Sequence, residues 1–520
     1  MNTAKVVLSK DYTIGKTEDG LFGSFVEHMG ATVYNGIFEP GHPKADADGF
    51  RLDVIDLVKQ LKLSAIRYPG GNFVSGFNWE DSVGPVDKRP TRLDLAWKAI
   101  EPNTFGLNEF MKWMKIISCN PIMTVNLGTR GVNEARNLVE YCNFNKGSYY
   151  SDLRRSHGVK EPYGIKAWCL GNEVDGPWQI GSKTAEEYGR IASEAGKVMK
   201  WVDPQIELIA AGSSTSRMDS YPEWDRIVLM HTYDIADYIS LHHYIDRRLQ
   251  FSEISRKTYF NGGIEKEDYQ NTAQYLARTI YVDRQIHDII ATCDYVKSVK
   301  RSNKTMKLAF DEWNVIAAKK HAGTEYQEWE TGSPLDCGAH SMEDALAFAS
   351  MMMSIIRRAD RVKIACQSLL VNTGPLIIAR KNGKAFANTI FYPFMHISGY
   401  GRGNVLQAVV DAPIYGTEEF EAVPVIDSLA VYNEEQREIS FFVVNRTESK
   451  VELNVDVRDF GNVKLNEHIY MAHEDINAAN TEDNPAKVIP KKYHHTKVEG
   501  GHIISVLSGY SWNVIRINIS

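Results

Sequence analysis

Short apolar runs alternate with stretches of helical period through residues 21–366, and this alternation limits what the chain can fold into. Eight runs have the length and composition of buried strands, and helical segments such as 51–63, 184–201 and 342–358 lie between them. A strand–helix unit repeated eight times predicts an α/β fold, a (β/α)8 TIM barrel. The eight runs are residues 21–26, 64–68, 121–126, 165–170, 206–211, 238–242, 308–310 and 362–366.

The pattern changes after about residue 401, where strand-like segments follow one another with turn residues between them. This predicts a C-terminal β-sandwich, jelly-roll-like, which the early strand 3–9 is expected to join. A chain of 520 residues is too long for one compact core. We therefore predict the N-terminal strand of the sandwich domain in residues 1–15, the barrel in 16–401 and the remaining β-sandwich domain in 402–520.

Two carboxylic acids follow predicted strands in matching contexts. Asn172 and Glu173 come after the run 165–170, and Glu312 follows 308–310. Glycoside hydrolysis needs two carboxyls that flank one bond, an acid that protonates the leaving oxygen and an ionised partner. For an isolated Asn–Glu pair a surface loop is the simpler interpretation, but the second acid favours catalysis. We expect Glu173 to be the acid.

Further polar residues lie at the ends of the other predicted strands. Active sites of (β/α)8 barrels are built at the carboxyl ends of the strands, so these side chains are expected to meet in one pocket. The alternative for each is a structural hydrogen bond in the barrel mouth. The set is Glu27, Arg67, Asn72, Asn126, His242, Tyr244 and Gln367.

Composition excludes several classes of protein. A net charge of −7 argues against nucleic acid or an anionic membrane as partner, and no apolar run approaches the roughly 20 residues of a membrane span. No N-terminal secretory signal is recognisable, so we expect a cytoplasmic protein. Six scattered cysteines without a CxxC motif are expected to be reduced thiols. The adjacent histidine pairs lack ligand spacing, so neither a metal nor a cofactor is expected.

Seven stretches of the chain resemble family 51 α-L-arabinofuranosidases, which are retaining glycosidases. They are residues 23–28, 67–73, 89–97, 126–131, 168–181, 231–234 and 311–314. The resemblance implies an exo-acting enzyme that releases terminal arabinofuranosyl residues from arabinose-containing oligosaccharides by double displacement. It also implies a homo-oligomer, a hexamer in many members.

Residue roles follow from the same resemblance. Glu173 is implied as acid/base, Glu312 as nucleophile and Asn172 as the partner of the sugar 2-hydroxyl. If configuration is retained, the two carboxyls should lie about 5–5.5 Å apart, and hydroxyl donors and cations should hold the pKa of Glu312 low. The subsite for the terminal sugar is implied to contain Glu27, Arg67, Asn72, His242, Tyr244 and Gln367, with Tyr244 also orienting Glu312.

The chain departs from the family pattern after Asn314, where many members have an aromatic residue and this chain has residues 315–317 of sequence Val-Ile-Ala. The loop 322–341, with Tyr326, Trp329 and His340, is expected to supply the missing wall. A related glycosidase acting on β-xylosides or β-glucans is the alternative, and a catalytically silent sugar-binding protein is disfavoured because both acids are present.

Overall fold

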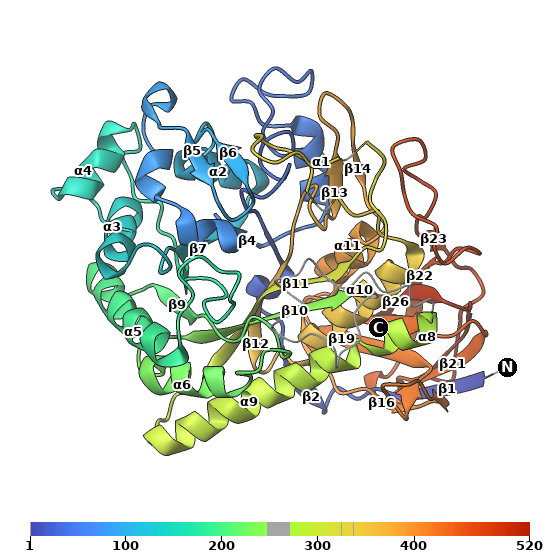
Figure 1. Ribbon diagram of the computed structural model, residues 1–520. Coiled ribbons are helices and arrows are strands. Elements are labelled where there is room, and N and C mark those ends of the chain that lie inside the picture. The colour runs from blue at the N-terminus through green and yellow to red at the C-terminus, as the bar shows by residue number, and fades with distance from the viewer. Residues whose placement is uncertain (1, 247–270, 324, 336) are drawn as a thin grey trace.

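The computed structural model describes residues 2–246, 271–323, 325–335 and 337–520. Eight parallel strands close into a barrel, as predicted (Figure 1). The order around the barrel follows the chain, since each strand pairs with the next and β12 pairs with β3. The strands are β3 Gly23–Phe25, β4 Ala65–Tyr68, β7 Asn120–Val125, β8 Ala167–Leu170, β9 Glu207–Ala210, β10 Tyr238–Asp246, β11 Lys307–Ile316 and β12 Val362–Gln367.

Helices connect the strands and cover the outside of the barrel. Helix α5, Ala185–Val202, begins after the cap residue Thr184, whose side chain accepts a hydrogen bond from the Glu187 amide. The sequence predicts one helix over residues 272 to about 300, but the segment is divided into α8 Thr272–Ala277 and α9 Ile280–Lys300. The polar composition of residues 246–271 predicts a loop before it, of which residues 247–270 lie outside the described residues. The others are α1 Leu52–Gln60, α2 Leu107–Ile117, α3 Val132–Asn143, α4 Tyr149–Ser156, α6 Glu223–Thr232, α10 Met342–Arg357 and α11 Phe391–Tyr400.

Two sheets form the β-sandwich, and the N-terminal strand β1, Asn2–Val7, belongs to one of them as predicted. It runs parallel to β21, Val451–Asp456, far away in sequence (Figure 1). Alternate residues of the two sheets, such as Leu453 and Phe441, meet in a shared core. The predicted boundaries at 15/16 and 401/402 stay predictions. The sheets contain β16-β1-β21-β25-β24 and β2-β15-β19-β20-β26-β22-β23.

The remaining bounds are β2 Thr13–Lys16, β15 Asn404–Leu406, β16 Val409–Asp411, β19 Ile426–Asn433, β20 Glu438–Asn445, β22 Val463–Met471, β23 Lys491–Lys492, β24 Lys497–Glu499, β25 His502–Leu507 and β26 Ser511–Ile519. Four short strands make two hairpins at the barrel mouth or beside it, β5 Arg92–Asp94 with β6 Ala99–Glu101 and β13 Ile377–Ala379 with β14 Ala385–Ala387. Strands β17 Ile414–Tyr415 and β18 Val423–Pro424 form a third pair.

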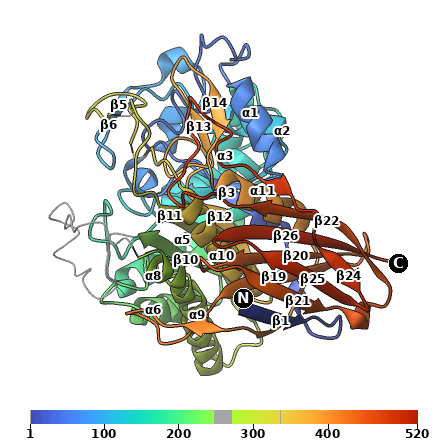
Figure 2. The same ribbon diagram turned by 90° about the vertical axis from the view of Figure 1, so that its right-hand side faces the viewer.

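Helix α10 joins the two parts of the molecule. Every residue from Met342 to Ile356 is buried, because one side of the helix packs on the barrel and the other on the sandwich (Figure 2). At its end Arg357 donates to Asp427 on β19 at 2.8 Å, and Arg446 reaches the same carboxylate at 2.9 Å. Among the described residues, no helix has the length and hydrophobicity to cross a membrane.

Candidate active site

An irregularity in β11 places two consecutive acids on the same side of the strand. Regular alternation would send Asp311 and Glu312 to opposite faces. The pairing of β11 with both neighbours shifts by one residue in this region, since Ala309 and Glu312 pair with Ser240 and His242. Such a bulge leaves one extra residue on the strand and redirects side chains. Asp311 and Glu312 are consequently both buried inside the barrel end.

Arg67, at the end of β4, contacts Glu312, Asp311 and the neighbour of Glu173, Asn172. Its Nη1 donates to Glu312 Oε2 at 2.9 Å, and its Nη2 donates to Asn172 Oδ1 at 2.6 Å. Its Nε lies 3.3 Å from Asp311 Oδ2. Because Arg67 occupies the amide oxygen of Asn172, the Asn172 amide NH2 is turned toward Asn72, whose Oδ1 lies 3.4 Å away.

Glu173 follows β8 in a backbone conformation that few non-glycine residues adopt. Its φ is +43°, two residues after Gly171 with φ +89°. The carboxylate accepts a hydrogen bond from Trp178 Nε1 at 2.7 Å, and its other oxygen lies 2.9 Å from His242 Nδ1. A strained residue held by two partners is typical of a functional position.

The two catalytic candidates lie close together. Glu173, His242 and Glu312 each offer a ligating atom, and these atoms all lie within 4.8 Å of one another. The Glu312 carboxylate also accepts a hydrogen bond from the Tyr244 hydroxyl at 2.7 Å. The prediction of a low pKa for Glu312 is wrong in direction. Burial is the largest influence and raises the pKa of Glu312, although the His242 and Arg67 cations and the Tyr244 hydroxyl oppose it.

The same three ligating atoms raise the question of a metal ion. A histidine ligand must be a neutral imidazole. Burial lowers the pKa of His242, but Glu312, Asp311 and Glu173 outweigh it and raise the pKa to about 10. His242 is thus an imidazolium among carboxylates, which makes this group an ion-pair network.

Glu27, after β3, is a third buried carboxyl of the site. Its Oε1 accepts hydrogen bonds from the Phe73 amide and from Trp97 Nε1, each at 2.8 Å. Burial, reinforced by the charge of Glu312, raises the pKa of Glu27 to about 8. The adjacent glycine makes room for it, because a Cβ at Gly71 would lie 2.4 Å from Glu27 Oε2.

Gln367 lies at the same end of the barrel, but its side chain is used within the protein. Its amide oxygen accepts from Ser24 Oγ at 3.1 Å, and its Nε2 donates to the Gly374 carbonyl. Asn126, another predicted strand-end residue, donates to the Phe77 carbonyl and caps the turn that follows β7. These contacts are structural hydrogen bonds of the barrel mouth.

A loop that begins after β11 crosses the barrel mouth to the β5–β6 hairpin. The Tyr326 hydroxyl donates to the Trp97 carbonyl, and the Trp329 amide donates to the Lys98 carbonyl, both at 2.6 Å. Trp329 keeps 42% of its surface exposed. His340 differs from the expectation, since it is fully buried and binds the Val315 carbonyl at 3.1 Å behind the site.

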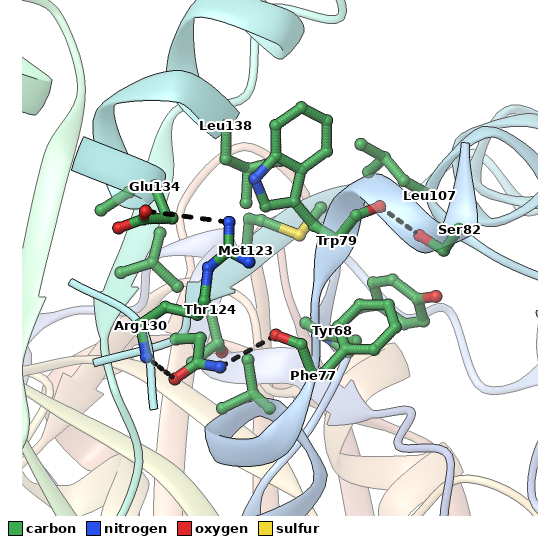
Figure 3. Close-up of a pocket in the computed structure, with 15 residues that line it drawn as sticks. Tyr68, Phe77, Trp79, Ser82, Leu107, Met123, Thr124, Arg130, Glu134 and Leu138 are labelled. Carbon is green, nitrogen blue, oxygen red and sulfur yellow. Dashed lines mark hydrogen bonds and ion pairs between the residues drawn. The ribbon is translucent and has the colours of Figure 1, made fainter. Parts of the chain in front are cut away.

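A cavity beside β4 and β7 does not belong to this cluster. It measures about 20 Å³ and lies between those strands, α2 and α3, with Trp79, Tyr68 and Met123 among its lining residues (Figure 3). That volume suits about one water molecule and is too small for a sugar. The lining contains none of the nine predicted catalytic and substrate-binding residues.

Three contributors were absent from the predicted set of site residues. Asp311 has the strongest signal, as an acid adjacent to Glu312 at a strand end. Trp97 and Trp178 each donate an indole N–H to a site carboxylate. Both lie within stretches that carry the family resemblance, but in loops, where no periodicity indicates which way a side chain points.

Known proteins resemble the chain over its whole length. Residues 57–257 match the family described as Alpha-L-arabinofuranosidase 1 domain, and residues 311–511 match the Alpha-L-arabinofuranosidase C-terminal domain family. The Intracellular exo-alpha-(1->5)-L-arabinofuranosidase 1 of Bacillus subtilis is 48% identical over 99% of both chains. An Exo-alpha-(1->6)-L-arabinofuranosidase of Bifidobacterium longum is 38% identical over 99% of this chain and 98% of its own.

Solved structures agree with these matches. A family 51 alpha-L-arabinofuranosidase from Bifidobacterium longum superimposes with a TM-score of 0.91 at 33% identity, covering 99% of each chain. The alpha-L-arabinofuranosidase from Thermotoga maritima, solved as an arabinose complex, gives a TM-score of 0.83 at 30% identity, with the same coverage. The chain therefore belongs to the family 51 α-L-arabinofuranosidases, as its sequence motifs had indicated.

Proposed function

We propose that this chain is an exo-acting, retaining α-L-arabinofuranosidase that releases terminal arabinofuranosyl residues from arabinose-containing oligosaccharides. The observation that carries the proposal is the approach of Glu173 and Glu312, with ligating atoms within 4.8 Å of one another. Retaining glycosidases keep their carboxyls about 5–5.5 Å apart, whereas inverting ones leave room for water at roughly 6.5–9.5 Å.

The geometry supports a division of labour. Glu312 is the nucleophile, because Arg67 and Tyr244 both donate to it and stabilise its ionised form. Glu173 is the acid/base, which protonates the leaving oxygen and later takes a proton from water. The Asn172 amide, oriented by Arg67 through its oxygen, has its NH2 group available to the sugar 2-hydroxyl.

Supporting residues complete the proposed subsite for the terminal sugar. Glu27 carries a protonated carboxyl at neutral pH, since burial raises its pKa to about 8, and can therefore both donate to and accept from sugar hydroxyls. Asn72 and Tyr244 face the same cluster. We retain His242 and Gln367 in the proposed subsite, although the amide of Gln367 binds Ser24 and Gly374.

A panel of nitrophenyl glycosides tests the activity. We expect turnover of the α-L-arabinofuranoside, and little on the β-D-xyloside or β-D-glucoside. NMR of the first sugar product should show the α-anomer before mutarotation. A preference for the β-xyloside would replace the proposal by the alternative barrel activity, and a β-arabinose product would exclude retention.

Azide distinguishes the two acids. Glu312→Ala should lose activity on every arabinoside because no glycosyl-enzyme forms. Glu173→Ala should keep glycosylation by substrates whose leaving group needs no proton, and azide should restore its turnover because azide needs no base. Rescue of Glu312→Ala in place of Glu173→Ala, with inverted arabinosyl azide as product, would mean that the roles are exchanged.

Two proteins suggest which linkage to test first. The relatives named above are called exo-α-(1→5) and exo-α-(1→6) enzymes, and the former is more similar to this chain. We propose α-(1→5)-linked arabino-oligosaccharides as the preferred substrate. Exposed Trp329, whose loop docks beside Trp97, is the proposed wall for the leaving-group sugar. Competition between α-(1→5)- and α-(1→6)-linked arabinobiosides would test the preference.

We also propose a cytoplasmic homohexamer. Five cysteines, Cys119, Cys142, Cys169, Cys293 and Cys366, are free thiols, which suits a reducing compartment, and several relatives are named intracellular. The hexamer follows from the family resemblance alone. Light scattering after size exclusion should give six times the chain mass of 58.8 kDa, and a monomeric mass would contradict the assembly.

A further inference from the structure

A buried row of three side chains runs behind the acid/base candidate. His242 Nδ1 lies 2.9 Å from Glu173 Oε1, and His242 Nε2 lies 3.4 Å from Asp311 Oδ1. Ser240 Oγ donates to the same Asp311 oxygen at 2.5 Å. All three members of the row are buried, so bulk water does not separate them. The imidazole thus connects Glu173 to a carboxylate on the far side.

The neighbouring residue His243 lies outside this row and has a pKa shifted in the opposite direction. The charge of His242 is therefore set by its own contacts and not by its place on β10. His243 points out of the barrel, and its Nδ1 lies 2.7 Å from Gln285 Oε1 on α9. Burial and the charge of Arg217 lower the pKa of His243 to about 4, whereas the pKa of His242 is raised to about 10. At neutral pH His243 is therefore neutral and the adjacent His242 is cationic.

The charges around His242 explain this difference. Glu173 after β8 and both Asp311 and Glu312 on β11 face it, the last at 3.7 Å, and Arg67 on β4 contacts the same two β11 acids. Glu27 adds no charge at neutral pH because its pKa is raised to about 8. Three carboxylates therefore face one permanent cation, and the excess negative charge in a buried site favours proton uptake by His242.

We propose that His242 and Asp311 form a proton-holding pair behind Glu173, which stores on His242 the proton that Glu173 delivers to the leaving oxygen. The inference rests on the proposed glycosidase function and extends it. His242 acts through Glu173 and Asp311 acts through His242, so both are positioning residues for this proton transfer.

The proton balance closes over the reaction. In the resting enzyme the proton lies on His242 Nδ1, in its hydrogen bond to ionised Glu173. It passes to Glu173 and on to the glycosidic oxygen, as that C–O bond breaks and Glu312 bonds to the anomeric carbon. Water then displaces Glu312 and gives a proton to Glu173, from which it returns to His242.

This sequence keeps the charge of the buried cluster constant. Formation of the ester removes the negative charge of Glu312, and departure of the proton removes the positive charge of His242. The row Glu173–His242–Asp311, the cation Arg67 and Glu312 together then carry the same net charge before and after the bond is broken. A constant net charge avoids the cost of creating an unpaired charge in a site without bulk water.

Leaving-group dependence tests the pair. We would compare kcat/KM on 2,4-dinitrophenyl α-L-arabinofuranoside, whose leaving group needs no proton, and on α-(1→5)-arabinobiose, whose leaving group does. His242→Gln and Asp311→Asn should lose about ten- to a hundredfold more on the arabinobiose, a part of the 10²–10⁴-fold that general acid catalysis supplies. Asp311→Asn also removes a partner of Arg67, but that change affects both substrates and cancels in their ratio.

His243→Gln is the matched control, the same substitution one residue along the strand and facing α9. It should leave the ratio between the two substrates unchanged. Asp311→Asn should also move the alkaline limb of kcat/KM for arabinobiose to lower pH by about one unit or more, because His242 loses an opposite charge and releases its proton more readily.

The outcomes separate the two proposals. A wild-type enzyme that hydrolyses neither arabinoside overturns the proposed function. An active wild type whose His242→Gln and Asp311→Asn variants lose equally on both substrates, with the alkaline limb unmoved, overturns the proton-holding pair alone. Circular dichroism and thermal melting of each variant identify any that fails to fold. For such a variant, His242→Asn provides a second substitution with the same expected ratio.

Discussion

Tyr244→Phe removes one hydrogen bond from the proposed nucleophile and keeps the aromatic ring. The Tyr244 hydroxyl donates to Glu312 Oε1 at 2.7 Å and lies 2.8 Å from Ser368 Oγ. The hydroxyl stabilises the ionised carboxylate and has less to stabilise once Glu312 is protonated. Its removal should therefore shift the proton equilibrium of Glu312.

The size of the shift follows from the strength of such bonds. A hydrogen bond to a charged group contributes about 1.5–3 kcal/mol, and 1.36 kcal/mol corresponds to one pKa unit. Burial already raises the pKa of Glu312, and loss of the Tyr244 donor should raise it by about one to two units more. Activity requires ionised Glu312, so it is gained as pH rises through this pKa. The acid limb of the profile should move to higher pH by the same amount.

The assay is kcat/KM against pH on an activated arabinoside, because that quantity reports the free enzyme. Trp178→Phe is the control, since the Trp178 indole donates to Glu173, the other acid, at 2.7 Å. It should leave the acid limb in place. If Tyr244→Phe lowers kcat/KM equally at every pH, without moving the acid limb, then Tyr244 does not control the ionisation of Glu312.

Three further predictions concern binding and packing. Asn172→Ala should lower kcat more than it raises KM on arabinosides, because its hydrogen bond to the 2-hydroxyl strengthens in the transition state; a change in KM alone would refute this role. Gly71→Ala should displace Glu27, at a cost of about 1–3 kcal/mol in unfolding free energy, and reduce kcat/KM. Gly76→Ala meets only the end of a flexible side chain at 3.2 Å and should resemble wild type in thermal melting and rate. Trp329→Ala should reduce kcat/KM on arabino-oligosaccharides and spare nitrophenyl arabinoside, and equal losses on both would exclude a leaving-group wall.

Strand positions could be predicted from sequence because each barrel strand is a short apolar run closed by glycine or polar residues. The run 165–170, for example, ends at Gly171, and β8 ends at Leu170. The rule that sites form at the carboxyl ends of barrel strands then identified Glu27, Arg67, Glu173 and Glu312 as neighbours. The structure brings the last three into direct or near contact around one cluster.

The position of a residue at a strand end did not predict which way its side chain points. Gln367 ends a barrel strand as Arg67 does, but its amide binds Ser24 and Gly374, because β12 pairs with β3 at this point. The low pKa of Glu312 was predicted from nearby hydroxyl donors and cations, without its burial. Its near-complete burial, which no local pattern reports, has the larger effect and opposite sign.

The least predictable feature is the face on which each member of a consecutive pair lies. His242 and His243 on β10 obey alternation, so one enters the site and the other packs on α9. Asp311 and Glu312 on β11 disobey it, because the bulge inserts one extra residue between the flanking pairs. Sequence alone treats the two pairs alike. The pairing register with the neighbouring strands determines which face each side chain takes. In this chain the register places Asp311 and Glu312 beside His242 alone, and these two negative charges favour a cationic His242 between the catalytic carboxyls.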